Sequence, residues 1–181
     1  EEVESCPLGD LDRTASRPGW AMTLDLDFGF VGEADHTLDS KHRVVVPKRF
    51  QSELDVAEGG PPSVVLMRGV EDCVYLFSVS GFQAFKKFVK TDPFGSKKKR
   101  AVSRKLFSKT FLVQLDSTGR ILVPEILRTC AGLTKEVVMV GVDERAEIWD
   151  RATWAAYEAE HEQDFQDLDE VLGEEETPSG V

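Results

Sequence analysis

Two short apolar runs, each behind the same kind of polar turn, form the clearest pattern in this chain. The first turn, at residues 39–42, leads into Arg-Val-Val-Val at 43–46, and the second, at 116–119, leads into Arg-Ile-Leu-Val at 120–123. Aliphatic and β-branched runs favour strands, and Asp and Ser at the start of a polar segment favour turns. Because an extended apolar segment also precedes each turn, the pattern predicts two β-hairpins.

The two hairpins are copies of one motif. Residues 38–47 read L-D-S-K-H-R-V-V-V-P, and residues 115–124 read L-D-S-T-G-R-I-L-V-P, 77 positions later. Each proline ends its strand and fits the first position of a helix, so short helices are expected at 48–54 and 125–131. A self-match at a fixed offset indicates an internal repeat.

The similarity of the two halves continues beyond these helices. In both halves a pair of apolar strands is expected next, beginning at Val64 and Val137 and ending at Ser78 and Asp150. A helical segment with two aromatic residues follows each pair. The chain therefore reads as two repeats of hairpin, helix, hairpin, helix. Neither half has enough apolar surface to fold well alone, so the halves are expected to pack together around a pseudo-twofold axis.

Composition indicates a globular chain. Of its 181 residues 41% are hydrophobic, and no apolar run approaches the roughly 20 residues of a membrane span. No signal-peptide pattern is present, so no membrane partner is expected. The three cysteines are far apart and lack zinc spacing, which favours a reduced, cytoplasmic compartment with no metal or cofactor.

The net charge of −11 combines a basic body with two acidic ends. Residues 1–35 carry −7 and residues 152–181 carry −10, whereas residues 36–151 carry +6. The body is therefore compatible with a polyanionic partner. Seven positive charges and no acid lie between residues 95 and 110, in the segment that joins the repeats. This segment is expected to form either a solvated basic helix or a phosphate-contacting one.

An acidic helix is expected near the C-terminus. An apolar stripe along this helix is given by residues that recur at three- and four-residue steps: Trp154, Tyr157, His161, Phe165, Leu168 and Leu172. The stripe is expected to pack against the body or against a neighbouring subunit.

The candidate chemistry lies in the doubled motif. Arg43 and Arg120 follow matched turns, and the planar fork of an arginine can bond guanine O6 and N7 together in the major groove. A two-stranded β-ribbon is narrow enough to enter that groove. Asp39 and Asp116 either close the turns or hold the guanidinium groups. Gly119 can adopt a positive φ without strain, whereas a histidine at the matching position of the first turn is slightly strained.

These motifs together resemble the MraZ family of bacterial transcriptional regulators, which are built from two SpoVT/AbrB-like repeats. The resemblance covers about residues 30–172. It implies an α+β, mainly β fold, in which two pseudo-symmetric swapped-hairpin repeats form a β-barrel with peripheral helices. It rests on Phe30, Gly32-Glu33, both L-D-S-x-x-R-x-x-V-P blocks, the run Glu136 to Gly141, and Glu147-Ile148-Trp149.

The resemblance also implies a function. MraZ-like proteins are ring-shaped homo-oligomers of the cytoplasm and nucleoid that bind G-rich direct repeats in double-stranded DNA. They mostly repress the division and cell-wall gene cluster. Carried over residue by residue, the expected DNA contacts are Arg43, Arg120, Lys41, His42, Thr118, Arg100 and Arg104, with Asp39, Asp116 and Gly119 shaping the turns. His42 stands where the family usually has glycine.

The expected layout follows from the repeats and from the charge distribution. It comprises a flexible acidic lead-in at 1–27, repeat 1 at 28–90, a basic connecting helix at 91–109, repeat 2 at 110–157, and an acidic C-terminal helix and tail at 158–181.

Two other functional classes stay open. Asp39 and Asp116 could meet as a hydrolytic carboxylate dyad that shares a proton, although an arginine four residues after each favours full ionisation. AbrB-like folds also resemble antitoxins, and the acidic segment 158–176 could bind a protein partner or screen the basic face from non-specific DNA. A non-enzymatic DNA-binding role is the favoured interpretation.

Overall fold

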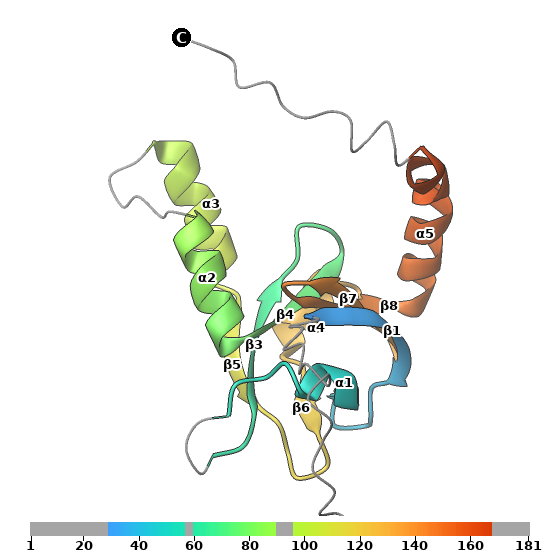
Figure 1. Ribbon diagram of the computed structural model, residues 1–181. Helices are drawn as coiled ribbons and strands as arrows, with labels where there is room; N and C mark the ends of the chain where they lie inside the picture. The colour runs from blue at the N-terminus through green and yellow to red at the C-terminus, as the bar shows by residue number, and fades with distance from the viewer. Residues whose placement is uncertain (1–28, 57–59, 90–95, 168–181) are drawn as a thin grey trace, which may run out of the picture.

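A computed structural model describes residues 29–56, 60–89 and 96–167 (Figure 1). The acidic lead-in expected at 1–27 and the end of the acidic C-terminal segment lie outside the described residues. Five helices and eight strands form within the described ranges. Both repeats run strand, strand, helix, strand, strand, helix, and one further helix lies between them, which is the order that the sequence predicted. The two strands that flank each motif turn pair with strands of the other repeat and not with each other, so the two local hairpins that were expected there are exchanged between the repeats.

All strands pair antiparallel, in two separate sheets. The six-stranded sheet has the order β1 (Phe30–Thr37), β7 (Glu136–Asp143), β8 (Ala146–Asp150), β4 (Cys73–Ser78), β3 (Ser63–Arg68) and β5 (Thr110–Gln114). The two-stranded sheet joins β2 (Arg43–Val45) to β6 (Arg120–Leu122). Among the described strands, β1 and β5 are the edges of the large sheet. The ladder hydrogen bonds therefore do not close the continuous barrel that was expected from the sequence.

The repeats are intertwined by strand pairing. The first strand of each repeat pairs with the third strand of the other, β1 with β7 and β5 with β3. β2 and β6 also pair between repeats, with Val44 opposite Ile121 at the centre of their register. If the corresponding strands are exchanged (β1 with β5, β3 with β7 and β4 with β8), the large sheet has the same strand order when read from its other edge. This is the relation expected of a pseudo-twofold axis.

One face of the large sheet, the hairpin side, packs against the two-stranded sheet. Two short helices, α1 (Lys48–Gln51) and α4 (Glu125–Cys130), cover the same side. Val44, Ile121, Phe50 and Leu127 are all fully buried there. Because successive residues of a strand face opposite sides of a sheet, the large sheet can bury a second core on its other face.

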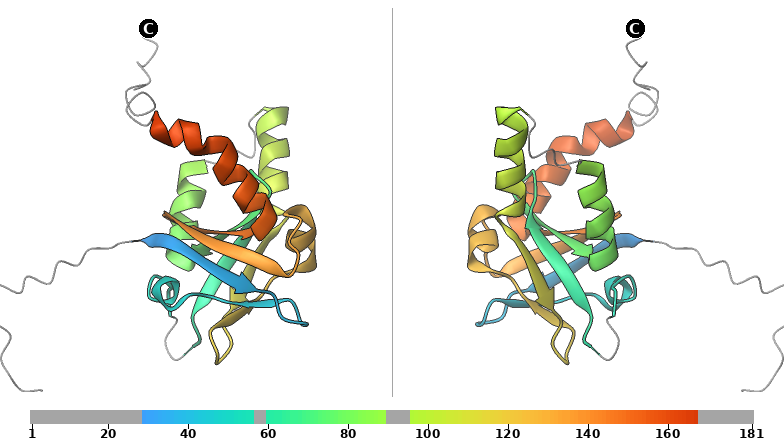
Figure 2. Two further views of the ribbon diagram at one scale, coloured as in Figure 1. Left: turned by 90° about the vertical axis from the view of Figure 1, so that its right-hand side faces the viewer. Right: turned by 90° about the vertical axis from the view of Figure 1, so that its left-hand side faces the viewer.

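That other face, the helix side, carries the three longer helices. They are α2 (Val79–Val89), α3 (Lys97–Phe107) and α5 (Arg151–Gln166). Trp149 is 2% exposed in the core beneath them, and Trp154 and Tyr157 pack against that core. Figure 2 shows the two sides, with the motif turns below the large sheet and α2, α3 and α5 above it. The sheet thus separates the doubled motif from the long helices.

Helix ends and stripes differ from the predictions in detail. α1 ends at Gln51, three residues before the expected position, and each motif proline precedes its helix as a cap. In α5 the apolar stripe packs only as far as His161, because Phe165 is 71% exposed. The outer turns of α5 therefore extend beyond the body and lack a packing surface within the described chain.

Two features are absent from residues 29–56, 60–89 and 96–167. No helix in these ranges has the length and apolar character needed to cross a bilayer. No three His, Cys, Asp or Glu side chains of the described part are grouped as metal ligands.

Candidate nucleic-acid interface

The first turn is built around one aspartate. The Asp39 carbonyl accepts the His42 N–H at 2.8 Å, and the Asp39 N–H donates to the Arg43 carbonyl at 2.9 Å. The Oδ1 atom of Asp39 accepts the backbone N–H groups of Lys41 at 2.8 Å and Arg43 at 2.9 Å. His42 has a φ of 59°, so the predicted left-handed conformation is confirmed. Hydrogen bonds between near neighbours therefore shape this turn.

The second turn repeats this construction. The Asp116 carbonyl accepts the Gly119 N–H at 2.9 Å, and Gly119 has a φ of 73°. Asp116 Oδ1 accepts the backbone N–H groups of Thr118 at 2.9 Å and Arg120 at 3.0 Å. It also accepts the Thr118 hydroxyl at 2.7 Å, a contact that the first turn lacks because lysine occupies the matching position.

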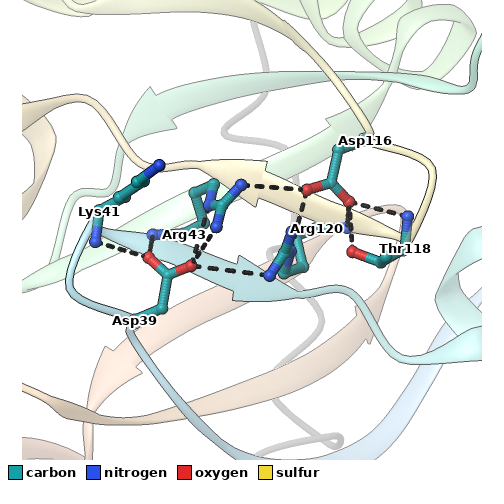
Figure 3. A network of polar contacts seen from close by, with 6 residues as sticks. All are labelled: Asp39, Lys41, Arg43, Asp116, Thr118 and Arg120. Carbon is teal, nitrogen blue, oxygen red and sulfur yellow. Dashed lines mark hydrogen bonds and ion pairs between the residues drawn. The ribbon is translucent and has the colours of Figure 1, made fainter.

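The four charged side chains of the motif form one network between the turns. Figure 3 shows Arg43 and Arg120 side by side, with Asp39 and Asp116 at their outer ends. Asp39 Oδ2 accepts Arg43 Nε at 2.9 Å, and Asp116 Oδ2 accepts Arg120 Nε at 2.9 Å. Longer ion pairs cross between the repeats, from Arg43 to Asp116 at 3.5 Å and from Arg120 to Asp39 at 3.8 Å. Each aspartate therefore closes its turn and also orients both arginines.

Both carboxylates are held in the ionised form. The pKa of Asp39 is lowered to about 2, mainly by the backbone N–H of Arg43 and further by its guanidinium. The pKa of Asp116 is also lowered, chiefly by the Thr118 hydroxyl and then by the backbone N–H of Arg120. A hydrolytic dyad requires one protonated carboxyl group. The network disfavours that state, because each aspartate faces two arginines.

The arginines remain accessible at the surface. The Arg43 side chain is 29% exposed and the Arg120 side chain 31% exposed. The contacts with the two aspartates engage Nε, Nη1 and Nη2 of Arg43, but only Nε and Nη1 of Arg120. Each terminal nitrogen carries two N–H groups, so both guanidinium groups keep donor capacity beyond these contacts. The arrangement is suited to donating oriented hydrogen bonds, and its net charge is close to zero.

The other predicted contacts fall into two groups. Lys41, His42 and Thr118 are exposed at the turns beside the network. Arg100 and Arg104 lie on α3, on the helix side of the sheet, and the chain does not bring them to the arginine pair. If they contact DNA held by the hairpins, they must belong to a different copy of the chain.

Sequence reasoning missed two residues beside the motif. Arg128 on α4 and Gln51 on α1 are 77 positions apart and pack against opposite turns. Arg128 Nε donates to the Val123 carbonyl at 3.2 Å, and Gln51 Nε2 donates to the Val46 carbonyl at 2.7 Å. The repeat offset could have paired them, but only the fold shows which turn each one meets.

Comparison with known proteins reproduces the internal repeat. The chain matches the family model described as "MraZ protein, putative antitoxin-like" twice, over residues 30–105 and 106–173. The two matches divide the chain close to the start of β5, where the second structural repeat begins. Both copies of the Asp-to-Arg motif fall within matched segments, and together the segments cover most of the sequence. The chain therefore belongs to the MraZ family.

Proposed function

We propose that the protein is a sequence-specific, double-stranded DNA-binding transcription regulator. In this proposal the β2–β6 ribbon enters the major groove, and Arg43 and Arg120 donate to guanine edges. The observation that carries the proposal is the coupled network in which two aspartates hold two accessible arginines side by side. Planar, bidentate donation to guanine is the commonest specific contact made by arginine.

Preorganisation makes this contact effective. A free arginine side chain carries about 2 kcal/mol of rotamer entropy, which is lost when it is fixed on DNA. Here folding already restricts the guanidinium groups through the aspartate contacts. A good bidentate pair is worth about 1–3 kcal/mol of discrimination against the wrong base. The aspartates therefore improve base reading even though they cancel the long-range attraction to phosphate.

A single protomer offers only two such arginines, so tight binding requires several copies. We propose a homo-oligomeric ring that presents the ribbons at regular spacing to repeats about 10 bp apart. Charge complementarity supports contact between copies: α3 carries Lys97, Lys98, Lys99, Arg100, Arg104 and Lys105, whereas α5 carries Glu158, Glu160, Glu162 and Asp164. The target, by family resemblance, is a set of G-rich direct repeats upstream of the division and cell-wall gene cluster, and the ring acts there in the nucleoid as a repressor.

The test is binding to DNA from upstream of the chain's own gene, beside a scrambled duplex at the same salt. Arg43→Ala and Arg120→Ala should each lower the preference for the native sequence by about 1–3 kcal/mol, roughly 5- to 150-fold. Lys86→Ala is the matched control, because Lys86 is an exposed cation of α2 on the helix side. The proposal is wrong if both arginine variants keep the wild-type preference.

A second candidate function is protein interaction of the antitoxin-like kind that the family description names. The observation in its favour is the acidic outer part of α5, where Phe165 is 71% exposed. Removing residues 163–181 deletes this part and keeps the stacked pair Tyr157 and His161, whose ring centroids are 4.1 Å apart. Loss of the oligomer would assign this segment to packing between copies, whereas tighter non-specific DNA binding would assign it to screening of the basic face.

A further inference from the structure

The two turns that carry the paired arginines match in backbone but not in charge. Each turn packs against the other repeat: the His42 carbonyl accepts the Val123 N–H at 3.1 Å, and the Gly119 carbonyl accepts the Val46 N–H at 2.9 Å. The first turn therefore lies beside α4 and the second beside α1. At three matched positions the group near the first turn is basic or an imidazole and its counterpart is neutral: Lys41 and Thr118, His42 and Gly119, Arg128 and Gln51.

The Arg128 and Gln51 pair is the most informative of the three. Both side chains donate to the carbonyl of the residue that precedes the motif proline, at 3.2 Å and 2.7 Å. Glutamine meets this backbone requirement without a charge. Arginine meets it through Nε and adds two terminal nitrogens and a full positive charge. The charge of Arg128 is therefore more than the backbone contact requires.

Arg128 lines a surface hollow of about 600 Å³ beside the first turn. Asp39, Ser40, His42 and Lys135 also line it, so two full positive charges and one carboxylate face the hollow. The corresponding hollow at the second turn is about 420 Å³, and none of the described residues that line it is Lys, Arg or His. Two matched pairs run the other way, Lys48 with Glu125 and Arg49 with Ile126, but none of these four residues lines either hollow. The excess of positive charge is therefore confined to the first turn and the lining of its hollow.

We propose that the hollow beside the first turn binds a phosphodiester group of the DNA backbone, with Arg128 and Lys135 as the cationic contacts. This inference rests on the proposed DNA-binding function. Because Arg43 and Arg120 are neutralised by two aspartates, attraction to the backbone must come from cations outside the network. The ribbon then has a phosphate-binding hollow at one end and, at the other, a hollow that no cation of the described residues lines.

This polarity gives each protomer a direction on DNA. A symmetric two-fold reader is matched to a palindrome, because operator symmetry mirrors protein symmetry. A ribbon with a pseudo-twofold backbone and one phosphate-binding end is instead matched to sites that all point the same way. The hollow at the first turn therefore favours direct repeats over inverted ones.

The test is Arg128→Gln, which installs the residue that the other repeat uses and keeps a donor for the Val123 carbonyl. Binding to native and scrambled duplexes is measured by fluorescence anisotropy across a salt series. The expected result is weaker binding to both duplexes, an unchanged ratio between them, and a salt slope lower by about 0.9 per lost phosphate contact. Lys135→Gln, at an exposed position, should act in the same direction and guards against misfolding of the first variant.

Lys86→Gln is the control, since it removes one charge on the helix side and should leave the slope unchanged. An unchanged slope in both Arg128→Gln and Lys135→Gln, with a clear wild-type preference for native DNA, would overturn the phosphate inference alone. Equal wild-type binding to native and scrambled duplexes would instead overturn the proposed function. Binding of inorganic phosphate that depends on Arg128, together with an unchanged DNA slope, would assign the hollow to a free anion and also overturn the inference.

Discussion

Gly119→Ala tests why the second turn has glycine where the first has histidine. A Cβ added at Gly119 would lie 2.4 Å from Nε2 of Gln51, well inside van der Waals contact. The amide of Gln51 would have to move, and it would lose its 2.7 Å bond to the Val46 carbonyl. The left-handed conformation itself tolerates a side chain, because His42 adopts it with a φ of 59°. The requirement for glycine is therefore set by the neighbour from the other repeat.

The expected loss of stability has two parts. Placing a non-glycine residue in the left-handed region costs roughly 1–2 kcal/mol, offset in part by the lower entropy of the unfolded alanine chain, so about 1 kcal/mol remains. Loss of the glutamine hydrogen bond adds about 1 kcal/mol. Gly119→Ala should therefore destabilise the fold by about 2 kcal/mol. With a urea m-value of about 2 kcal/mol/M, the midpoint falls by about 1 M.

Gly132→Ala is the matched control. Gly132 also has a left-handed φ, 59°, but an added Cβ would meet no atom within 4 Å. Gly132→Ala should therefore lose only the backbone part of the stability, about 1 kcal/mol, and should show about half the shift in the urea midpoint. The difference should vanish in a Gln51→Ala background, where the clash is absent. Equal shifts for the two glycine variants in the wild-type background would refute the reasoning.

Two further predictions concern buried and titrating groups. The carboxylate of Glu147, which is 7% exposed, accepts hydrogen bonds from Arg145 at 2.8 Å and from Trp149 at 3.0 Å. Arg145→Ala removes the positive partner of this buried charge, so it should lower the free energy of unfolding, measured in urea, by on the order of 3 kcal/mol. Adding Glu147→Gln removes the unpaired charge and should recover much of this loss. A double variant no more stable than Arg145→Ala would show that the unpaired carboxylate is not the cause of the loss. Acid should destabilise the protein in two stages. Burial lowers the pKa of His36 below its ordinary 6.5, and the positive charge of Arg49 on α1 lowers it further. The pKa of Asp39 is lowered to about 2. Both groups bind fewer protons in the folded state than in the unfolded state, so each contributes its full stabilisation above its unfolded pKa. The contribution of His36 falls as the pH drops below about 6.5, and that of Asp39 falls as the pH drops below about 4. His36→Gln should flatten the first stage of a pH series of unfolding midpoints, and an unchanged first stage would assign it to another group.

The turns were predictable because they are local. The bonds that shape each one join residues no more than four positions apart, and the motif names the donors and the acceptor. The positive φ at His42, the pairing of Asp39 with Arg43 and the repeat order of elements all follow from this short range. The DNA-facing roles of the predicted residues stay predictions, since the geometry supports them without testing them.

The meeting of the two arginines was not predictable from the motif. Arg43 and Arg120 lie 77 residues apart, and they share carboxylates only because β2 pairs with β6 across the repeats. The same folding placed Arg104 on the opposite face of the sheet, where the basic charge of α3 is separated from the ribbon. Charge runs in a sequence carry no information about which face of a sheet they will occupy.

Hydrogen bonds between near neighbours and the spacing of apolar residues encode the repeat, the order of elements and the shape of each turn, so these could be predicted from the amino-acid order. Which turn meets which helix depends on contacts between the repeats, which bring Arg128 to the first turn and Gln51 to the second. These contacts form because the buried core is shared by both halves. Each half pairs its strands with the other, and contacts across the two repeats complete the site.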